Sequence, residues 1–213
     1  MDSCVYTRNH TCTETFSYLV YEPTDRKPEE KLPMIVFLHG AGERGTDPTV
    51  MTCHSIPMIF DKPNDYRCIV VCPQCPAGEV WLQHLDALHR FIVKMVHQYN
   101  ADPDAIALTG ISMGGFGSWE LAMAYPGTFS CVVPVCGGGM SWRAENLRNL
   151  PVRAFHGEAD TLVPPQYSIE MVDKVNLAGG DATLTLYPGV GHDSWVKAYE
   201  SGIIDWMIRQ RRK

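Results

Sequence analysis

The sequence predicts an α/β fold, in which a mostly parallel sheet has helices on both faces. Strand-like runs alternate with segments of helical spacing along the chain. The strand-like runs are apolar throughout, which is typical of strands that are buried on both faces of a parallel sheet. A serine flanked by glycines, in Gly110-Ile111-Ser112-Met113-Gly114, lies between one such run and the start of a helix, as at a sharp strand-to-helix bend.

Each expected element rests on a local pattern of residues. Strand composition predicts strands at 15–21, 33–38, 67–72, 105–109, 129–136, 152–156 and 182–187. Helical spacing, ended by Gly, Pro or Asn, predicts helices at 82–99, 116–124, 165–177 and 194–211, and a short helix around 50–60 within the crossover 43–66. Because no repeat, linker or low-complexity stretch interrupts the pattern, we expect residues 1–213 to form a single domain.

The bulk composition excludes several classes of protein. A chain of 213 residues can bury a sizeable core, and its net charge of -6 argues against a general nucleic-acid binder. No apolar run is long enough to span a bilayer, so we expect no membrane partner. The segment 1–8 lacks the pattern of a signal peptide, which makes a cytoplasmic location the expectation. The oligomeric state is not predicted.

Eight cysteines raise the question of redox or metal chemistry. Several lie in apolar runs, where a free cysteine behaves as a small buried hydrophobe. Cys72 and Cys75 form a C-x-x-C motif, which in other settings is redox-active or binds zinc. A loop-like Pro76-Ala77-Gly78 follows instead of a helix, and no second C-x-x-C exists. We therefore favour buried thiols over a redox or zinc site at these two cysteines.

The glycines around Ser112 have a steric explanation. A strand that turns directly into a helix holds its central residue in a cramped conformation, so side chains two positions before and after it would collide. The hydroxyl of Ser112 then stands clear of the sheet, and the first N–H groups of the helix favour developing negative charge. The alternative is a glycine-rich turn with a capping serine.

A serine hydroxyl is a poor nucleophile unless a base accepts its proton and a carboxylate orients the base. Two later strand ends offer these partners, and we assign His192 as general base and then acid, with Asp160 orienting it. The order Ser, Asp, His is the one used by strand–elbow–helix architectures. Glu158 and Asp193 are the rival carboxylates, although Asp193 adjoins His192 and would have difficulty reaching its far ring nitrogen.

The remaining histidines are weaker candidates for catalysis. We expect His84, His89 and His97 to lie on the surface of a helix. His156 ends a strand and is interpreted as structural, whereas His39 is expected to shape the glycine-rich turn that follows the strand 33–38.

A tetrahedral intermediate also needs backbone N–H donors for its oxyanion. We expect one donor from Met113, directly after the serine, and the other from Ala41 in the turn after the first core strand. Gly40 and Gly42 would allow that backbone to approach the substrate closely. The alternative is that the turn is purely structural.

With these residues placed, the chain resembles the α/β-hydrolase superfamily over nearly its whole length. The segments that carry the resemblance are LHGAGERG at 38–45, GISMGG at 110–115, HGEADTLVP at 156–164 and Gly191-His192. The chain is most similar to compact carboxylesterases of the phospholipase/carboxylesterase, dienelactone-hydrolase and feruloyl-esterase-like groups, and also to the catalytic domain of prolyl-oligopeptidase-type peptidases. The resemblance implies cofactor-free and metal-free ester hydrolysis through an acyl-enzyme.

Departures from these groups narrow the expectation. Dienelactone hydrolases use a cysteine where this chain has Ser112, and the chain has no room for a propeller domain. Only a short segment separates the strands 129–136 and 152–156, where many lipases insert a lid, so we expect an open site for short acyl groups.

Trp81, Trp142 and Trp195 lie in loops expected to border the site. They are candidates to bind an aromatic or sugar-linked acyl group, with packing in the core or at the rim as the alternative for each. The leading hypothesis is a serine carboxylesterase for small soluble esters, including acetylated or hydroxycinnamoylated carbohydrate. A small serine peptidase and a catalytically silent binding domain on the same fold are the alternatives.

Overall fold

The computed structural model describes residues 14–212. Cys4, Cys12 and the segment judged for a signal peptide lie outside the described residues.

The centre of the molecule is a seven-stranded sheet with the order β1-β3-β2-β4-β5-β6-β7. Strand β1 pairs antiparallel with β3, and every other neighbouring pair is parallel. The strands are β1 Tyr18–Tyr21, β2 Met34–Leu38, β3 Ile69–Pro73, β4 Ile106–Ile111, β5 Cys131–Val135, β6 Val152–Gly157 and β7 Ala182–Tyr187. Every residue of β2, β3, β4 and β5 is buried, as the apolar runs predict.

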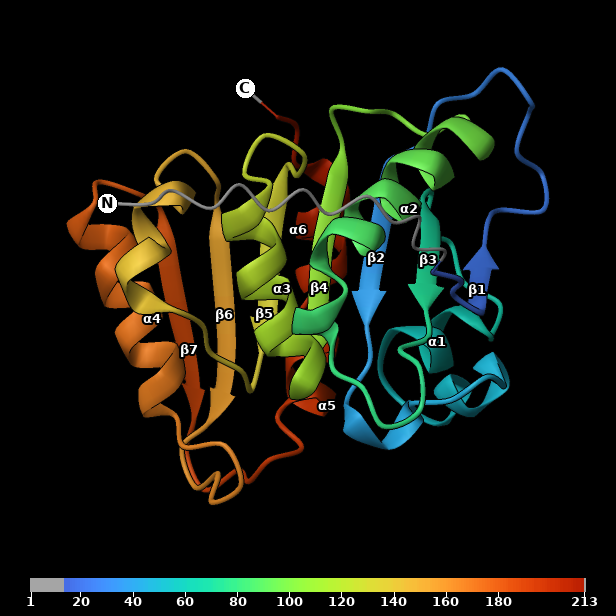
Figure 1. Cartoon of the computed structure of the whole chain (residues 1–213). Coiled ribbons are helices and arrows are strands. Elements are labelled where there is room, and N and C mark those ends of the chain that lie inside the picture. The colour runs from blue at the N-terminus through green and yellow to red at the C-terminus, as the bar shows by residue number, and fades with distance from the viewer. Residues whose placement is uncertain (1–13, 213) are drawn as a thin grey trace, which may run out of the picture.

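Helices cover both faces of the sheet (Figure 1). Toward the viewer lie α2 Leu85–Gln98, α3 Met113–Ala124 and α4 Gln166–Leu177, and behind the sheet lie α5 Trp195–Glu200 and α6 Ile203–Arg209. Helix α1 Ser55–Phe60 contacts α5. The 3₁₀ helices are η1 Ala41–Glu43, η2 Pro48–Cys53, η3 Trp81–Gln83 and η4 Ser141–Leu147. The predicted α/β fold is confirmed.

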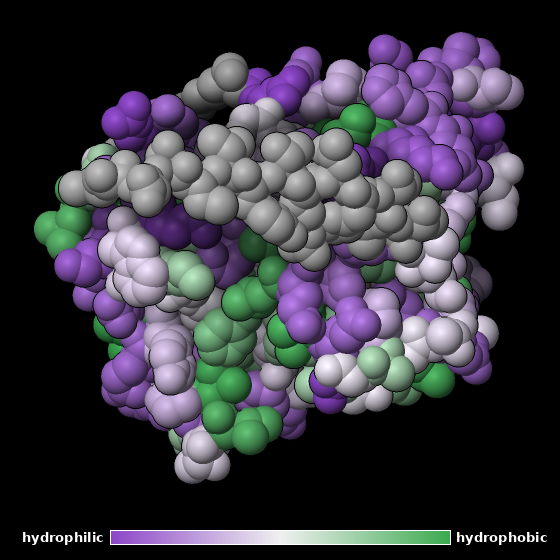
Figure 2. Space-filling model, viewed as in Figure 1, coloured by the Kyte–Doolittle hydropathy of each residue, from purple (hydrophilic) through white to green (hydrophobic). Residues whose placement is uncertain are grey.

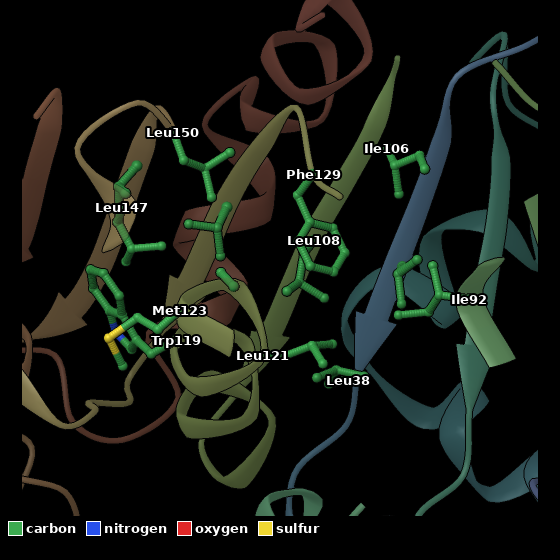
Figure 3. Close-up of a cluster of buried hydrophobic side chains, with 14 of the residues drawn as sticks. Leu38, Ile92, Ile106, Leu108, Trp119, Leu121, Met123, Phe129, Leu147 and Leu150 are labelled. Atoms are coloured by element: carbon green, nitrogen blue, oxygen red, sulfur yellow. The ribbon is translucent and has the colours of Figure 1, made fainter. Parts of the chain in front are cut away.

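The sheet separates two hydrophobic clusters. Figure 3 shows part of the first cluster: Leu108 lies beside Phe129, Leu121 of α3 beside Leu38, and Trp119 beside Met123. The second cluster joins the opposite sheet face to α1, α5 and α6 through residues such as Phe37. Because α3 packs into the first cluster, the bend that precedes this helix is held by the core.

The predicted helices differ from the structure at four places. The predicted helix 82–99 opens as the 3₁₀ helix η3, and α2 begins only at Leu85. Helix α3 begins at Met113 rather than Phe116, because the bend at Ser112 passes directly into the helix. The predicted helix 194–211 is divided into α5 and α6 at Gly202, whose φ of 82° lies in the left-handed region that glycine adopts without strain. The crossover holds a 3₁₀ helix followed by α1 rather than one short helix.

Among residues 14–212, no helix has both the length and the apolar character needed to cross a bilayer. The six cysteines of this part of the chain, at positions 53, 68, 72, 75, 131 and 136, are unpaired. Burial raises the pKa of the Cys75 thiol to about 11 and also raises that of Cys72. Both thiols are buried and held protonated near neutral pH, so the geometry favours the buried-thiol interpretation of the C-x-x-C motif.

The register of the parallel strands brings the candidate segments to one edge of the sheet. Leu38 at the end of β2 pairs with Gly110 of β4, and Ile111 pairs with Val135 at the end of β5. Gly157 at the end of β6 pairs with Tyr187 at the end of β7. The loops that follow these strands therefore meet at the carboxyl edge, which is the lower edge in Figure 1.

Candidate active site

Ser112 occupies a strained bend between β4 and α3. Its φ of 52° and ψ of -117° lie outside the regions that L-residues favour. The backbone N–H of Ser112 donates to the carbonyl of Val135 at 3.0 Å, which ties the bend to the end of β5. Strain of this kind persists only where the surrounding structure fixes it, and it is concentrated at functional sites.

The glycines beside Ser112 are required by close backbone packing. A Cβ atom on Gly110 would lie 2.4 Å from the carbonyl oxygen of Gly114, and a Cβ atom on Gly114 would lie 1.9 Å from the carbonyl oxygen of Leu38. Neither clash can be relieved by rotating a side chain, because the opposing atoms belong to the backbone. The steric explanation given for the sequence motif is confirmed.

Ser112, His192 and Asp160 form a chain of hydrogen bonds. Oδ2 of Asp160 lies 2.7 Å from Nδ1 of His192, and Nε2 of His192 lies 2.9 Å from Oγ of Ser112. An ionised carboxylate only accepts, so Nδ1 carries the hydrogen and Nε2 accepts from the serine hydroxyl. The three residues come from loops after β4, β6 and β7, and the structure brings together the serine, histidine and aspartate that the sequence selects.

Asp160 is held from several sides. Its Oδ1 accepts hydrogen bonds from the N–H groups of Leu162 and Val163, both at 2.9 Å. Burial alone raises the pKa of the Asp160 carboxyl, but the hydrogen bonds from His192, Val163 and Leu162 outweigh burial and hold the pKa below its usual value. Asp160 is thus ionised when it accepts the hydrogen bond from Nδ1 of His192.

The rival carboxylates are not in this chain of hydrogen bonds. Glu158 and Asp193 are exposed, and among residues 14–212 neither carboxylate accepts a hydrogen bond from His192.

Two helices near Ser112 begin with residues whose backbone N–H groups are free of the helix's own hydrogen bonds. Met113 is the first residue of α3 and Ala41 is the first residue of η1, so neither N–H has an acceptor within its own helix. The pairing of Leu38 with Gly110 sets the turn containing Ala41 beside the bend at Ser112. These are the two N–H groups that the sequence predicts as donors to an oxyanion.

The turn after β2 is anchored by buried polar contacts. Nδ1 of the fully buried His39 donates to the carbonyl of Gly40 at 2.6 Å, and Nε2 accepts from the N–H of Cys75 at 2.9 Å. Nε1 of Trp81 donates to the carbonyl of His39 at 3.0 Å. His39 shapes the glycine-rich turn as predicted. Trp81 has no exposed surface, so its assignment to substrate binding is wrong and it is a core residue.

Trp195 lies beside the hydrogen-bond chain. Its ring is 5.6 Å from the ring of His192, edge to face, and 5.6 Å from the ring of His54. Nε2 of His54 lies 3.1 Å from Oε1 of Glu43, whose pKa burial would raise but the hydrogen bond from His54 lowers. This second histidine–carboxylate pair borders the site.

Neither member of this pair is predicted as a site residue from the sequence. Glu43 stands within the motif LHGAGERG, but His54 lies in the irregular crossover, where no periodicity marks it. The one signal in the sequence is the length of that crossover, because long loops on a rigid scaffold often carry specificity.

Apolar side chains are exposed after β5 and β6, among them Met140, Trp142, Leu162 and Tyr167, with Trp142 76% exposed. In Figure 2 a hydrophobic band descends across the middle of this face toward the carboxyl edge. The ring of Tyr167 packs edge to face on that of Phe116 at 5.8 Å, and Phe116 lies in the first turn of α3. Apolar surface therefore extends from the neighbourhood of Ser112.

The three histidines predicted on the helix 82–99 differ in their burial. His84 is buried with Nδ1 2.7 Å from Oε2 of Glu14, so its predicted surface position is wrong. Periodicity could not reveal this because His84 precedes α2 and contacts Glu14 and Phe16, which lie before β1 in the chain. His89 stacks on Tyr125 and is half-buried, and His97 is exposed. Within the described chain, no group of three or more His, Cys, Asp or Glu side chains is arranged to hold a metal.

The parallel sheet and the glycine-flanked bend after β4 define the α/β-hydrolase fold. A sequence profile of the phospholipase/carboxylesterase family matches residues 80–203, which is more than half of the 213 residues, and the chain belongs to this family. The resemblance drawn from the motifs is confirmed. Family membership supports carboxylic ester hydrolysis as the class of activity.

Solved structures agree with this assignment. A thermostable esterase is 33% identical with a TM-score of 0.78, and the match covers 92% of this chain and 59% of that one. This chain thus spans less than two thirds of that protein. Esterase PE8 is 21% identical with a TM-score of 0.67, with coverage of 88% and 98%. A putative dienelactone hydrolase from Klebsiella pneumoniae subsp. pneumoniae MGH 78578 is 15% identical with a TM-score of 0.72, with coverage of 92% and 94%. The last two show the fold. No curated protein sequence matches the chain significantly.

The packing at the bend predicts the outcome of Gly114→Ala. The added methyl group meets the carbonyl oxygen of Leu38, so we expect a loss of at least about 3 kcal/mol in the free energy of unfolding. Urea unfolding followed by circular dichroism measures it. Gly127→Ala is the matched control, because a Cβ atom there meets nothing within 4 Å. Equal stabilities of the two variants would contradict the packing argument.

The environment of Asp160 predicts a pH-dependent stability difference between the wild type and Asp160→Asn. Because the pKa is lowered by folding, the ionised carboxylate stabilises the fold above its unfolded-state value of 3.8, and this contribution is lost as the pH falls through the folded-state value. We expect the wild type to be more stable by about 1–3 kcal/mol at pH 7.

Urea unfolding at pH 7, 5 and 3 measures this difference, which should be similar at pH 7 and 5 and smaller at pH 3. Asp193→Asn, at an exposed carboxylate, should show no comparable trend. A difference for Asp160→Asn that stays constant down to pH 3 would refute the electrostatic assignment.

Proposed function

We propose that the chain is a serine carboxylesterase that hydrolyses small soluble esters through an acyl-enzyme, with Ser112 as nucleophile. The observation that supports this most strongly is the hydrogen-bond chain from Oγ of Ser112 through His192 to Asp160, with distances of 2.9 and 2.7 Å. The nucleophile, the base and the group that orients the base have the geometry that acyl transfer requires.

In the first half of the reaction, Oγ of Ser112 attacks the ester carbonyl carbon while Nε2 of His192 accepts the hydroxyl proton. The imidazolium that forms is stabilised by the ionised Asp160, whose lowered pKa keeps it charged. His192 then returns the proton to the departing alcohol oxygen, and the acyl group remains bonded to Oγ. A water activated by the same nitrogen releases the acid by the reverse sequence.

The oxyanion of each tetrahedral intermediate would be stabilised by the N–H groups of Ala41 and Met113. In this assignment Met113 contributes the positive end of α3, which favours developing negative charge. The removal of one such donor typically costs about 10²–10³ in kcat.

The substrate class follows from the surroundings of the hydrogen-bond chain. The segment between β5 and β6 contains only the short 3₁₀ helix η4, which supports an open site rather than one closed by a lid. Trp195 and Trp142, together with the exposed Leu162 and Tyr167, offer apolar and aromatic surface. We therefore favour short acyl groups or a flat hydroxycinnamoyl group, carried by an alcohol such as a carbohydrate.

Two other functions use the same fold. A small serine peptidase of the prolyl-oligopeptidase type would require the same three residues, and a binding domain would require none of them. An aminoacyl amide cleaved as fast as the matching ester would favour the peptidase. Failure of Ser112 to react with a fluorophosphonate probe would favour the binding domain.

The primary test is the hydrolysis of nitrophenyl esters of increasing acyl length by the wild type and by Ser112→Ala. We expect turnover on acetate and butyrate that falls with longer chains, and a loss of about 10⁴-fold or more in kcat in the variant, since removal of the nucleophile leaves only oxyanion stabilisation and binding. Activity that survives the substitution would remove Ser112 from its role. Absence of turnover on every ester would sink the proposed function.

Trp195→Ala tests the aromatic wall beside His192. If the ring holds a flat acyl group, kcat/KM for a methyl hydroxycinnamate should fall about tenfold while kcat/KM for nitrophenyl acetate changes much less. Val196→Ala, at the exposed neighbour on α5, is the control and should match the wild type on both substrates. Equal losses on the two substrates would instead assign Trp195 to holding His192 in place.

A further inference from the structure

His156 is a second histidine on the Asp160 carboxylate. It lies fully buried on β6, directly before the loop that carries Asp160. Its Nε2 is 2.8 Å from the carbonyl oxygen of Val163 and 3.3 Å from Oδ2 of Asp160. Both of these oxygens only accept hydrogen bonds, so Nε2 must carry a hydrogen that points between them.

The other ring nitrogen faces a shared hydroxyl. Nδ1 of His156 lies 2.8 Å from Oγ of the buried Ser168, and the same Oγ donates to the carbonyl oxygen of Gly137 at 2.9 Å. In a neutral ring that carries its hydrogen on Nε2, Nδ1 therefore shares the one hydroxyl hydrogen of Ser168 with that carbonyl. Burial lowers the pKa of His156, so the ring is neutral near neutral pH, with its single hydrogen on Nε2. A buried histidine with both nitrogens engaged is fixed in orientation.

This arrangement surrounds the Asp160 carboxylate with donors. Oδ2 faces Nδ1 of His192 at 2.7 Å and Nε2 of His156 at 3.3 Å, and Oδ1 faces two backbone N–H groups. Val163 is held twice, since its N–H donates to Asp160 and its carbonyl accepts from His156. His156 therefore fixes both the carboxylate and the turn in which it stands.

We propose that His156 is a positioning residue that orients Asp160 and draws part of its negative charge away from His192. The inference rests on the proposed function, because it acts through His192 as the base. With the Nε2–H present, the Asp160 charge is shared between two histidines. Without it, the full charge would fall on His192 and favour its protonated form, so the acid limb of the pH profile should move to higher pH.

Asp160 and His156 are not the only titratable groups around His192, but the others do not supply the same effect. The others are the exposed Asp193 beside His192, the buried thiol of Cys136 after β5, and the Glu43–His54 pair beyond Trp195. Burial raises the pKa of the Cys136 thiol to about 12, so it is uncharged across the working range. Apart from His192 itself, His156 is the ring whose nitrogen lies within 3.3 Å of Oδ2 of Asp160.

A matched pair of substitutions separates positioning from packing. In His156→Gln the amide nitrogen can occupy the place of Nε2 and donate to Asp160, whereas the shorter amide of His156→Asn reaches only the place of Nδ1. We expect His156→Asn to lose roughly ten- to a hundredfold in kcat and to move the acid limb of kcat/KM upward by about half a pH unit. His156→Gln should recover most of the rate and the original profile.

Rates are normalised to the fraction of enzyme that a fluorophosphonate probe titrates, so partial unfolding does not imitate the effect. Equal rate losses with an unmoved profile in both variants would overturn the proposal and leave His156 a packing residue. If neither variant folds, ¹⁵N NMR of the wild-type histidine rings decides: a hydrogen on Nε2 of His156 supports the proposal, and one on Nδ1 alone overturns it. If the wild type cleaves no ester, the proposed function itself is refuted. The comparison of the two variants tests only the role of His156.

Discussion

The close packing of backbone against backbone at the bend between β4 and α3 is the constraint on which the rest of the structure depends. Gly110 and Gly114 bring the first turn of the helix within contact of the end of β2, and Ser112 keeps a positive φ because neither side can move. The bend is held by the buried core that α3 shares with the sheet. The orientation of the serine is thus a property of the whole sheet rather than of a flexible loop.

The carboxyl edge of the sheet also supplies the hydrogen-bond donors that a buried carboxylate needs. A buried aspartate is costly unless donors compensate its charge, and the loop after β6 supplies backbone N–H groups together with two histidine rings. His192 is on the loop after β7, the neighbouring strand, so this donor reaches the carboxylate only when the two loops are folded together. Correct assembly of the sheet and formation of the serine–histidine–aspartate chain are therefore coupled.

The features that the sequence predicts are those with a local or periodic cause. Apolar runs predict the buried strands, and the spacing around Ser112 predicts the bend because its steric demand is local. Burial of Trp81 and His84 depends on which distant segment covers them, and periodicity does not contain that information. The Glu43–His54 pair was missed for the same reason, since only tertiary folding joins the two residues.

The residues of the hydrogen-bond chain and the residues that border the site also lie in different parts of the fold. Ser112 and Asp160 are fixed by strand ends, where any change in backbone position meets a packed core. Trp142 and His54 stand on 3₁₀ helices or in the crossover, where a changed side chain has solvent or another loop beside it. Substitutions in these loops can therefore alter the ester that is bound without disturbing the bond-breaking geometry. Trp195 is the exception, because it contacts both His54 and His192 and so transmits any change in the loops to the base itself.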